Sequence, residues 1–316
     1  MIKSGRSMDL ADRVLAGDQR AIARAISLVE NDPEAAAVLM PRLAGRIGKA
    51  RVIGVTGAPG VGKSTLVDRL ALEYRRRDRT VGILAVDPTS PFSGGAILGD
   101  RVRMHRHVLD DGVYVRSMAT HGHLGGLSHA TSDAVLVLDA AGRDVVLIET
   151  AGVGQAEVDI ARTADASIVV TTPDAGDGVQ AMKAGIMEIA DVFVVNKADR
   201  PGVDRAAAEI EEMLSIREFD AGAWRPPVLK TRAATGDGVP AVVEAVERFE
   251  GERGDSRERR RARARSRLME LLQQQFVERL ERQDEIRKLI DDAVERMAAG
   301  EIDPYAAAAE IMERAS

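Results

Sequence analysis

The middle of the chain alternates short apolar runs with longer stretches whose apolar residues recur at helical spacing. Short runs rich in Val and Ile are typical of strands that are buried on both faces of a parallel sheet. The predicted strands are Val52 to Thr56, Thr80 to Val86, Val113 to Ser117, Asp144 to Glu149, Ala166 to Thr172, Val192 to Asn196 and Val228 to Thr231. Most of these runs are separated by enough residues for a helical crossover, so we predict an α/β fold with a mostly parallel sheet and helices on both faces.

The first part of the chain is predicted to be helical. Residues 8–48 contain two segments with helical spacing, and both Asp18 and the pair Asp32-Pro33 are suitable helix starts. We therefore expect a helical extension at residues 1–50, which precedes a sheet domain at residues 51–250.

The last part of the chain, residues 251–316, is also predicted to be helical. A long helix follows the charged stretch Glu250 to Asp255, carries leucines at helical spacing and is expected to end at Gly300. Asp303-Pro304 is the expected start of a final helix. The apolar stripe of the long helix is narrow and must be covered by its own domain or by a second copy, and we favour a homodimer.

Composition excludes several classes of protein. Of the 316 residues 45% are hydrophobic but only 3% are aromatic, so the core must be mostly aliphatic. A net charge of −6 argues against non-specific binding to nucleic acid or to an anionic membrane. The arginine-rich segment Arg257 to Arg267 could indicate nucleic acid, but neighbouring glutamates favour a solvated helix face. The absence of cysteine excludes disulfides and thiolate metal sites.

Targeting signals are also missing from the sequence. Met1 to Asp9 lacks the apolar core of a signal peptide, and no apolar run reaches membrane-spanning length. We therefore expect a soluble, cytoplasmic protein.

The most specific motif joins the first predicted strand to a helix through a glycine-rich loop. Gly57 is followed, after four residues, by Gly62-Lys63-Ser64, which is the spacing of a phosphate-binding P-loop. The glycines allow the backbone to approach an anion, Lys63 reaches the β and γ oxygens, and the Ser64 hydroxyl ligates Mg²⁺. The predicted nucleotide contacts in this loop are Gly57, Ala58, Pro59, Gly60, Val61, Gly62, Lys63, Ser64 and Thr65.

A second motif, Asn196-Lys197-Ala198-Asp199, follows an apolar strand and predicts recognition of guanine. The Asp199 carboxylate can accept hydrogen bonds from N1–H and the 2-amino group of guanine. Adenine offers no such pair of donors and would leave a buried charge without a partner. Together the two motifs predict a site for GTP.

Carboxylates at the ends of two other strands are candidates for the metal and for the attacking water. Asp87 and Glu149 lie at the same predicted sheet edge, where either could hold Mg²⁺, and Glu149 could also orient water. Gly152 could donate its N–H to the γ-phosphate and so act as a switch. The Gly/Ser/Pro-rich segment from Pro88 to Asp100 is a candidate switch loop.

Two features leave alternatives open. All five histidines fall between His105 and His129, which is compatible either with a metal-delivery site or with a polar surface near the phosphates. No arginine finger can be assigned from the sequence, although Arg101, Arg103 and Arg106 are possible. We therefore expect slow intrinsic GTP turnover that a partner or a dimer mate accelerates.

Several longer motifs resemble the MeaB/ArgK family of GTPases, which are chaperones of methylmalonyl-CoA mutase related to the human methylmalonic aciduria type A protein. The motifs that carry this resemblance lie at residues 87–101, 122–126, 149–155, 176–180 and 183–188. The resemblance covers nearly the whole chain. It implies a SIMIBI-class P-loop GTPase domain at 51–250 and a C-terminal dimerisation extension at 251–316.

The resemblance also implies a function. It points to a GTP-binding and GTP-hydrolysing protein that gates adenosylcobalamin loading and protects or reactivates the mutase, with Mg²⁺ beside GTP or GDP. The cobalamin would belong to the mutase. Two alternatives are a nickel-type metallochaperone GTPase on the same scaffold and a transport-associated kinase or ATPase.

Site residues are implied by matching the family's motifs position by position. Lys63 and Ser64 would bind phosphate and Mg²⁺, and Asp87, Asp100 and Glu149 would surround the metal and the attacking water, with Lys63, Glu149 and Asp100 in the catalytic set.

The same matching implies a base site and a further switch. Asn196, Lys197 and Asp199 would hold guanine, and the stretch from Asp177 to Gln180 resembles a switch that conveys the nucleotide state to the partner. The second guanine loop would be Arg232, Ala233 and Ala234, where Arg232 replaces the small hydroxyl residue expected in the family.

Overall fold

The computed structural model describes residues 10–88, 107, 109–120, 129–150, 156–173, 184–217, 219–220, 222–252 and 256–315. The chain forms two compact units, residues 1–259 and residues 260–316.

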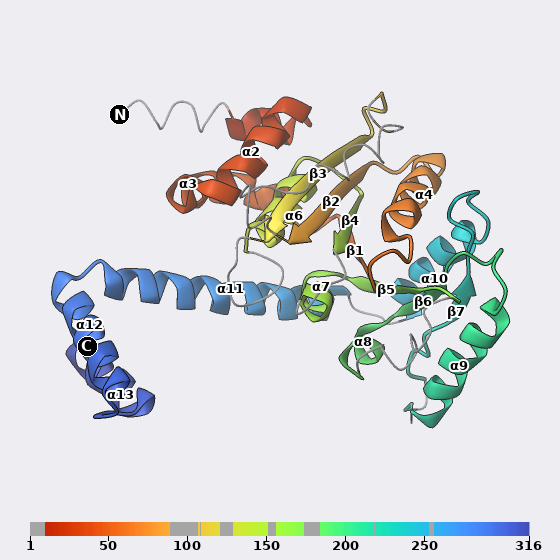
Figure 1. Cartoon of the computed structure of the whole chain (residues 1–316). Helices are drawn as coiled ribbons and strands as arrows, with labels where there is room; N and C mark the ends of the chain where they lie inside the picture. The colour runs from red at the N-terminus through yellow and green to blue at the C-terminus, as the bar shows by residue number, and fades with distance from the viewer. Residues whose placement is uncertain are drawn as a thin grey trace. The chain divides into compact units, whose positions relative to one another are not determined.

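The first unit is built on a parallel sheet of seven described strands (Figure 1). The strand order is β3-β2-β4-β1-β5-β6-β7, and every neighbouring pair is parallel. The strands are β1 Arg51–Thr56, β2 Val81–Pro88, β3 Val113–Thr120, β4 Val145–Thr150, β5 Ala166–Thr171, β6 Val192–Val195 and β7 Val228–Lys230. This confirms the predicted α/β fold. Because all strands point the same way, the loops after them gather at one edge of the sheet.

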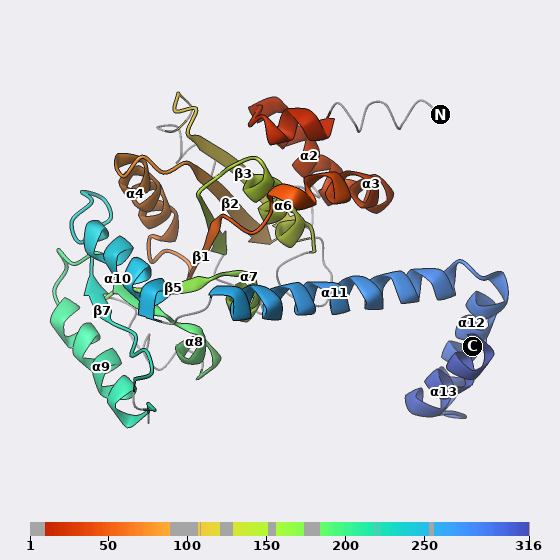
Figure 2. The same ribbon diagram turned by 180° about the vertical axis from the view of Figure 1, so that it is seen from behind.

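Helices cover both faces of this sheet, as a parallel sheet requires. Those of the first unit are α2 Gln19–Asn31, α3 Pro33–Leu43, α4 Lys63–Arg76, α6 His129–Ala140, α7 Ala156–Thr163, α8 Ala184–Ile189, α9 Val203–Ile216 and α10 Val239–Glu252, with a short 3₁₀ helix η1 at Ala44–Arg46. Helices α4 and α10 pack together on one face, as Figure 2 shows from behind. Helices α6 and α7 cover the other face, and α2 and α3 pack against α6.

Alternate residues of each strand enter the two cores. In β1, Val52 packs with α6, whereas Ile53 and Val55 pack with α4 and α10. In β6, Phe193 faces α9 in a third cluster, and its neighbour Val194 faces α10. Full burial of each such side chain contributes about 1.5–3 kcal/mol, which fixes the register of the strands and hence the position of the loops that follow them.

The strand starts differ by one residue from the prediction at three places, and β1 begins one residue earlier, at Arg51. Thr80 and Asp144 precede β2 and β4 instead of beginning them. The Asp144 carboxylate accepts hydrogen bonds from the backbone N–H of Thr80 at 2.8 Å and from its hydroxyl at 2.9 Å. These side-chain hydrogen bonds therefore link the two chain segments just before β2 and β4 begin.

The N-terminal helices begin where the sequence predicts. The Asp18 carboxylate accepts the N–H of Ala21, and the Asp32 carboxylate accepts the N–H of Ala35, so each aspartate caps its helix. The prediction of two helices in this region was incomplete, because residues 10–15 form a further helical segment, which buries Leu10.

The second unit contains the end of α11 Ser256–Glu281, together with α12 Asp284–Ala298 and α13 Pro304–Ala315. The prediction of one long helix that ends at Gly300 was wrong, because the helix is interrupted after Glu281. Gln283 has an extended backbone (φ −87°, ψ 110°), and Asp284 and Glu285 occupy the first turn of α12. Acidic residues there favour a new helix N-terminus. Asp303 caps α13, as predicted, by accepting the N–H groups of Tyr305 and Ala306.

Candidate functional site

The predicted P-loop lies between β1 and α4, at the carboxyl edge of the sheet. Gly57, Gly60 and Gly62 all have positive φ, which side chains disfavour. A Cβ on Gly57 would collide with the carbonyl oxygen of Val170, and one on Gly62 would collide with the side chain of Asn196. The loop can therefore pack against two neighbouring segments only because these positions are glycine.

Lys63 begins α4 and points back into the loop. Its buried ammonium donates hydrogen bonds to the carbonyl oxygens of Gly57 at 2.8 Å and Ala58 at 3.0 Å. The amino end of α4 contributes unpaired N–H groups and the positive end of its dipole at the same place. The arrangement is thus suited to a polyphosphate.

The next residue, Ser64, meets a carboxylate from another strand. Its hydroxyl donates a hydrogen bond of 2.6 Å to Oε1 of Glu149, which is the last residue but one of β4 and is 6% exposed. Strand register places Glu149 beside Val55 of β1 and Ala85 of β2. A hydroxyl and a carboxylate oxygen in contact, beside a phosphate loop, are hard oxygen ligands of the type Mg²⁺ prefers, so these residues fit a magnesium ion.

The other predicted metal and switch residues are described in part or not at all. Asp87 lies at the end of β2 in register with Ala119 of β3, and its backbone alone is described. The residues outside the described part are Asp100, Gly152, Asp177 and Gln180, together with Arg101, Arg103 and Arg106.

The predicted guanine-reading segment packs directly on the P-loop. Asn196 is 3% exposed and donates a hydrogen bond of 2.9 Å to the carbonyl of Val61. Lys197 has φ 58° and donates a hydrogen bond of 2.8 Å to the carbonyl of Gly60. Two side chains therefore fix this segment to the phosphate loop, although 135 and 137 residues separate the bonded pairs in the chain.

The loop after β7 completes this pocket. Oδ1 of Asn196 accepts hydrogen bonds from the Thr231 hydroxyl at 3.1 Å and from the N–H of Ala233 at 3.0 Å. Arg232 lies beside Asp199, with Nε 3.6 Å from the nearer carboxylate oxygen, and both side chains are about half exposed. The structure thus brings the 57–65, 196–199 and 232–234 segments together.

Two residues that the sequence reasoning missed hold this pocket in place. Arg69 of α4 donates hydrogen bonds to the carbonyls of Ala233 at 3.0 Å and Ala234 at 2.5 Å. Thr231 contributes the hydroxyl bond to Asn196 described above. Neither residue belongs to a local motif, because its role depends on a contact between segments far apart in the sequence.

One member of the histidine cluster has a described side chain, His107. It is buried, and its Nε2 atom lies 3.0 Å from Oδ1 of Asp68 on α4. His105, His121 and His123 lie outside the described part, and of His129 the backbone alone is described. Within the described residues, no group of three or more His, Cys, Asp or Glu side chains is arranged to hold a metal ion.

A model of the family described as methylmalonyl-CoA mutase-associated GTPase MeaB matches residues 22–285. The chain belongs to the MeaB family. Relatives match it over most of its length. A protein of Pyrococcus horikoshii that is named as a GTPase is 45% identical over 311 residues, which cover 97% of each chain. The mouse methylmalonic aciduria type A homolog, a mitochondrial protein, is 31% identical over 329 residues, covering 96% of this chain and 79% of the mouse protein.

The fold of this chain is also similar to that of a solved structure. The crystal structure of an LAO/AO transport system kinase superposes with a TM-score of 0.71 at 25% identity, over 98% of this chain and 97% of that one. The family, its relatives and the P-loop fold identify this MeaB protein as a GTP hydrolase. In the part of the chain that the structure describes, no helix combines the length and the apolar character needed to cross a membrane.

Proposed function

We propose that this MeaB protein is a GTP-dependent chaperone of an adenosylcobalamin-dependent methylmalonyl-CoA mutase, gating cofactor loading and protecting or reactivating the enzyme. The family description, which names the mutase, and the mouse relative's name support the choice of partner. The observation that carries the nucleotide part is the position of Asn196, whose side chain bonds both the phosphate loop and the guanine loop. Base and phosphate recognition therefore share one pocket.

Within that pocket each candidate residue has a distinct role. Lys63 neutralises charge on the β and γ oxygens, and Glu149 orients the attacking water, with Asp100 as a further catalytic residue. Asp199 accepts the guanine donors, and Ala233 and Ala234 present their backbone to the base. Phosphoryl transfer needs positioning and charge neutralisation more than covalent chemistry, which fits this set.

Magnesium is proposed beside the nucleotide. Ser64 and Glu149 would hold it, together with Asp87 and Asp100, and when bound it supplies charge neutralisation at the phosphate oxygens. The contact of 2.6 Å between Ser64 and Glu149 supports this assignment, because it places two oxygen ligands at one point beside the loop. Turnover without a partner is expected to be slow, since a further cation at the γ-phosphate would come from the mutase or a dimer mate.

The nucleotide state is proposed to reach the mutase through the segments that contain Gly152, Asp177 and Gln180. The experiment that tests the function is capture of methylmalonyl-CoA mutase by the purified protein, with GDP or with a non-hydrolysable GTP analogue. We expect the amount of bound mutase to differ between the two nucleotides. Equal capture in both states, or no capture in either, would overturn the proposal.

The protein is further proposed to act as a homodimer through its C-terminal helices. On α11, Leu268, Leu272 and Phe276 recur at helical spacing and are 45–56% exposed, which leaves an apolar stripe for a second copy. We expect Leu272→Glu/Phe276→Glu to elute as a monomer in size-exclusion chromatography with light scattering. Gln273→Glu, which adds the same kind of charge in the same turn but beside the stripe, should leave the dimer intact.

The alternative functions can be separated by simple measurements. A transport-associated kinase would use ATP, so a comparison of GTP and ATP binding decides against it when GTP is preferred. A metallochaperone would bind nickel through the histidine segment. Metal titration of His121→Ala/His123→Ala beside wild type tests that alternative, because unchanged binding removes it.

A further inference from the structure

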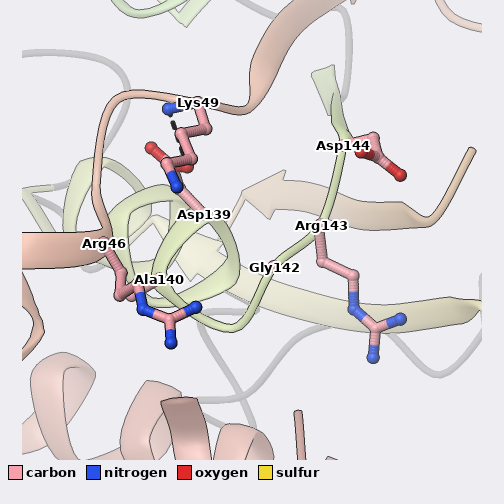
Figure 3. Close-up of a pocket in the computed structure, with 7 residues that line it drawn as sticks. All are labelled: Arg46, Lys49, Asp139, Ala140, Gly142, Arg143 and Asp144. Carbon is pink, nitrogen blue, oxygen red and sulfur yellow. Dashed lines mark hydrogen bonds between the residues drawn. The ribbon is translucent and has the colours of Figure 1, made fainter. Parts of the chain in front are cut away.

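A cavity of about 150 Å³ opens at the amino edge of the sheet, at the other end of β1 from the P-loop. One wall is the connection from η1 to β1, with Arg46 and Lys49. The other is the turn from α6 to β4, residues 139–144 (Figure 3). In Figure 3 the side chains of Arg46 and Arg143 lie on either side of Gly142. None of these residues belongs to the nucleotide site.

The two carboxylates that line this cavity are already engaged. Asp139 accepts hydrogen bonds from the N–H groups of three consecutive residues, Gly48, Lys49 and Ala50. Asp144 accepts two from Thr80, as described above. Their negative charge is therefore stabilised by backbone and hydroxyl dipoles, and they serve to hold the walls in place.

The positively charged side chains of the cavity have fewer hydrogen-bond partners and fewer opposite charges beside them. Arg143 is 6% exposed, donates from Nη1 to the carbonyl of Asp111 at 3.2 Å, and has a buried Nε without a hydrogen-bond partner. Burial lowers the pKa of Arg143, and the charge of the nearby Arg75 adds to this effect.

Nearby acidic groups offset the charge of Arg143 only in part. Asp110 and Asp111 favour its charged form, but Asp110 is already held by Arg75 through two hydrogen bonds. Within the described part of the chain, the side chains of Arg46 and Lys49 form no ion pair or hydrogen bond.

We propose that this cavity is a second ligand site, which binds a small oxyanion: a phosphate or a carboxylate group, free or carried by a metabolite. Three cations line it, and the side chain of Arg143 has a buried donor to offer. A guanidinium fork matches the geometry of both oxyanions and binds them through paired, charge-assisted hydrogen bonds. Gly142 leaves room at the entrance, because a Cβ there would meet no atom within 4 Å. The site is independent of the proposed mutase chaperone role.

The test uses full-length protein with GDP and Mg²⁺ bound, so that the P-loop is occupied. Inorganic phosphate, sodium acetate and sodium chloride are titrated by calorimetry at constant ionic strength. We expect saturable binding of phosphate or acetate and none of chloride. The stronger of the two oxyanions then identifies the source of the ligand group. Equal responses to all three salts would show general screening and overturn the proposal.

Variants locate the binding. Arg46→Gln/Lys49→Gln removes two exposed cations without touching the buried Arg143, and we expect at least about tenfold weaker oxyanion binding, because charge-assisted hydrogen bonds to the ligand are lost. Arg20→Gln/Arg24→Gln, which removes two exposed cations of α2, is the matched control. Unchanged affinity in the first variant would contradict the site.

A second measurement needs no variant. In the GDP-bound wild type, acetylation of Lys49 by an N-hydroxysuccinimide ester is followed by mass spectrometry with and without phosphate. Phosphate is expected to slow acetylation of Lys49 and to leave the exposed Lys288 of α12 unchanged. Equal slowing at both lysines, or none at Lys49, would count against an oxyanion in this cavity.

Discussion

The ammonium of Lys197 lies 2.8 Å from the carbonyl oxygen of Gly60, although 137 residues separate the two in the chain. This bond ties the predicted guanine-reading segment to the phosphate loop, so the two segments are in direct contact.

Asp199→Ala should abolish the preference for GTP over ATP. The wild-type carboxylate is proposed to accept two donors from guanine, and a hydrogen-bonding site of this kind discriminates by on the order of 10⁴-fold. Calorimetry with both nucleotides measures the ratio. Asp204→Ala, on the neighbouring helix α9, is the control and should keep the wild-type preference. Retention of that preference in Asp199→Ala would mean that guanine is read elsewhere.

Ser64→Ala should weaken GTP binding when Mg²⁺ is present and have little effect in EDTA. The lost hydroxyl is a proposed metal ligand, and a hydrogen bond or ligand contact to a charged group contributes about 1.5–3 kcal/mol, or roughly tenfold or more in affinity. Fluorescent GTP titrations in the two conditions give the comparison. Ser64→Thr keeps the hydroxyl and should restore most of the magnesium effect. An equal loss in both conditions would instead indicate a structural role.

Arg69→Gln should weaken both GTP and GDP by about tenfold, because the loop at Ala233 and Ala234 loses two charge-assisted hydrogen bonds. Arg69→Lys retains a single ammonium, which can reach one of the two carbonyls, and is expected to bind with intermediate affinity. Equilibrium dissociation constants of the three proteins provide the measurement. If Gln and Lys at this position both bind like wild type, Arg69 does not support the base site.

The pair Arg75–Asp110 should make stability depend on pH. Hydrogen bonding from Arg75 holds the pKa of Asp110 below its ordinary value. The stabilisation is therefore fully present above the unfolded-state pKa of about 3.9 and is lost as pH falls through the lowered folded-state pKa. Both groups are partly exposed, so we expect about 0.5–1 kcal/mol.

The check for this pair is urea unfolding of Arg75→Gln and wild type between pH 3 and pH 7. The difference in the free energy of unfolding should be largest near pH 7 and shrink toward pH 3. Arg76→Gln changes the adjacent, more exposed arginine and should give little difference at any pH. A constant difference across the range for Arg75→Gln would rule out the ion pair as its cause.

Features set by short stretches of sequence could be predicted. The seven strands were located within three residues at each end from their Val and Ile runs, and the helix starts at Asp18, Asp32 and Asp303 from their capping side chains. The interruption at Gln283 was missed, because apolar residues keep helical spacing on both sides of it. Periodicity reports which face is apolar and is insensitive to a single residue with an extended backbone.

In the candidate site, too, residues of contiguous motifs could be predicted and residues that depend on distant contacts could not. The P-loop and the Asn196 segment are contiguous motifs, so their residues could be named from sequence, and the structure joins the two segments by side-chain hydrogen bonds. Arg69 and the pair of His107 with Asp68 could not be found, because each depends on a contact between elements distant in the chain. Their side chains are ordinary helix or loop residues until tertiary packing brings them together.

Helix α4 carries Lys63 and Ser64 in its first turn and Arg69 in its second. The same helix therefore positions both the proposed phosphate-binding residues and the loop that is proposed to surround the base. Grafting a foreign base-recognition loop onto this scaffold would leave its carbonyls without the guanidinium that supports them. Re-engineering of this protein toward another nucleobase therefore has to begin on the phosphate-binding helix, several residues away from any atom of the base.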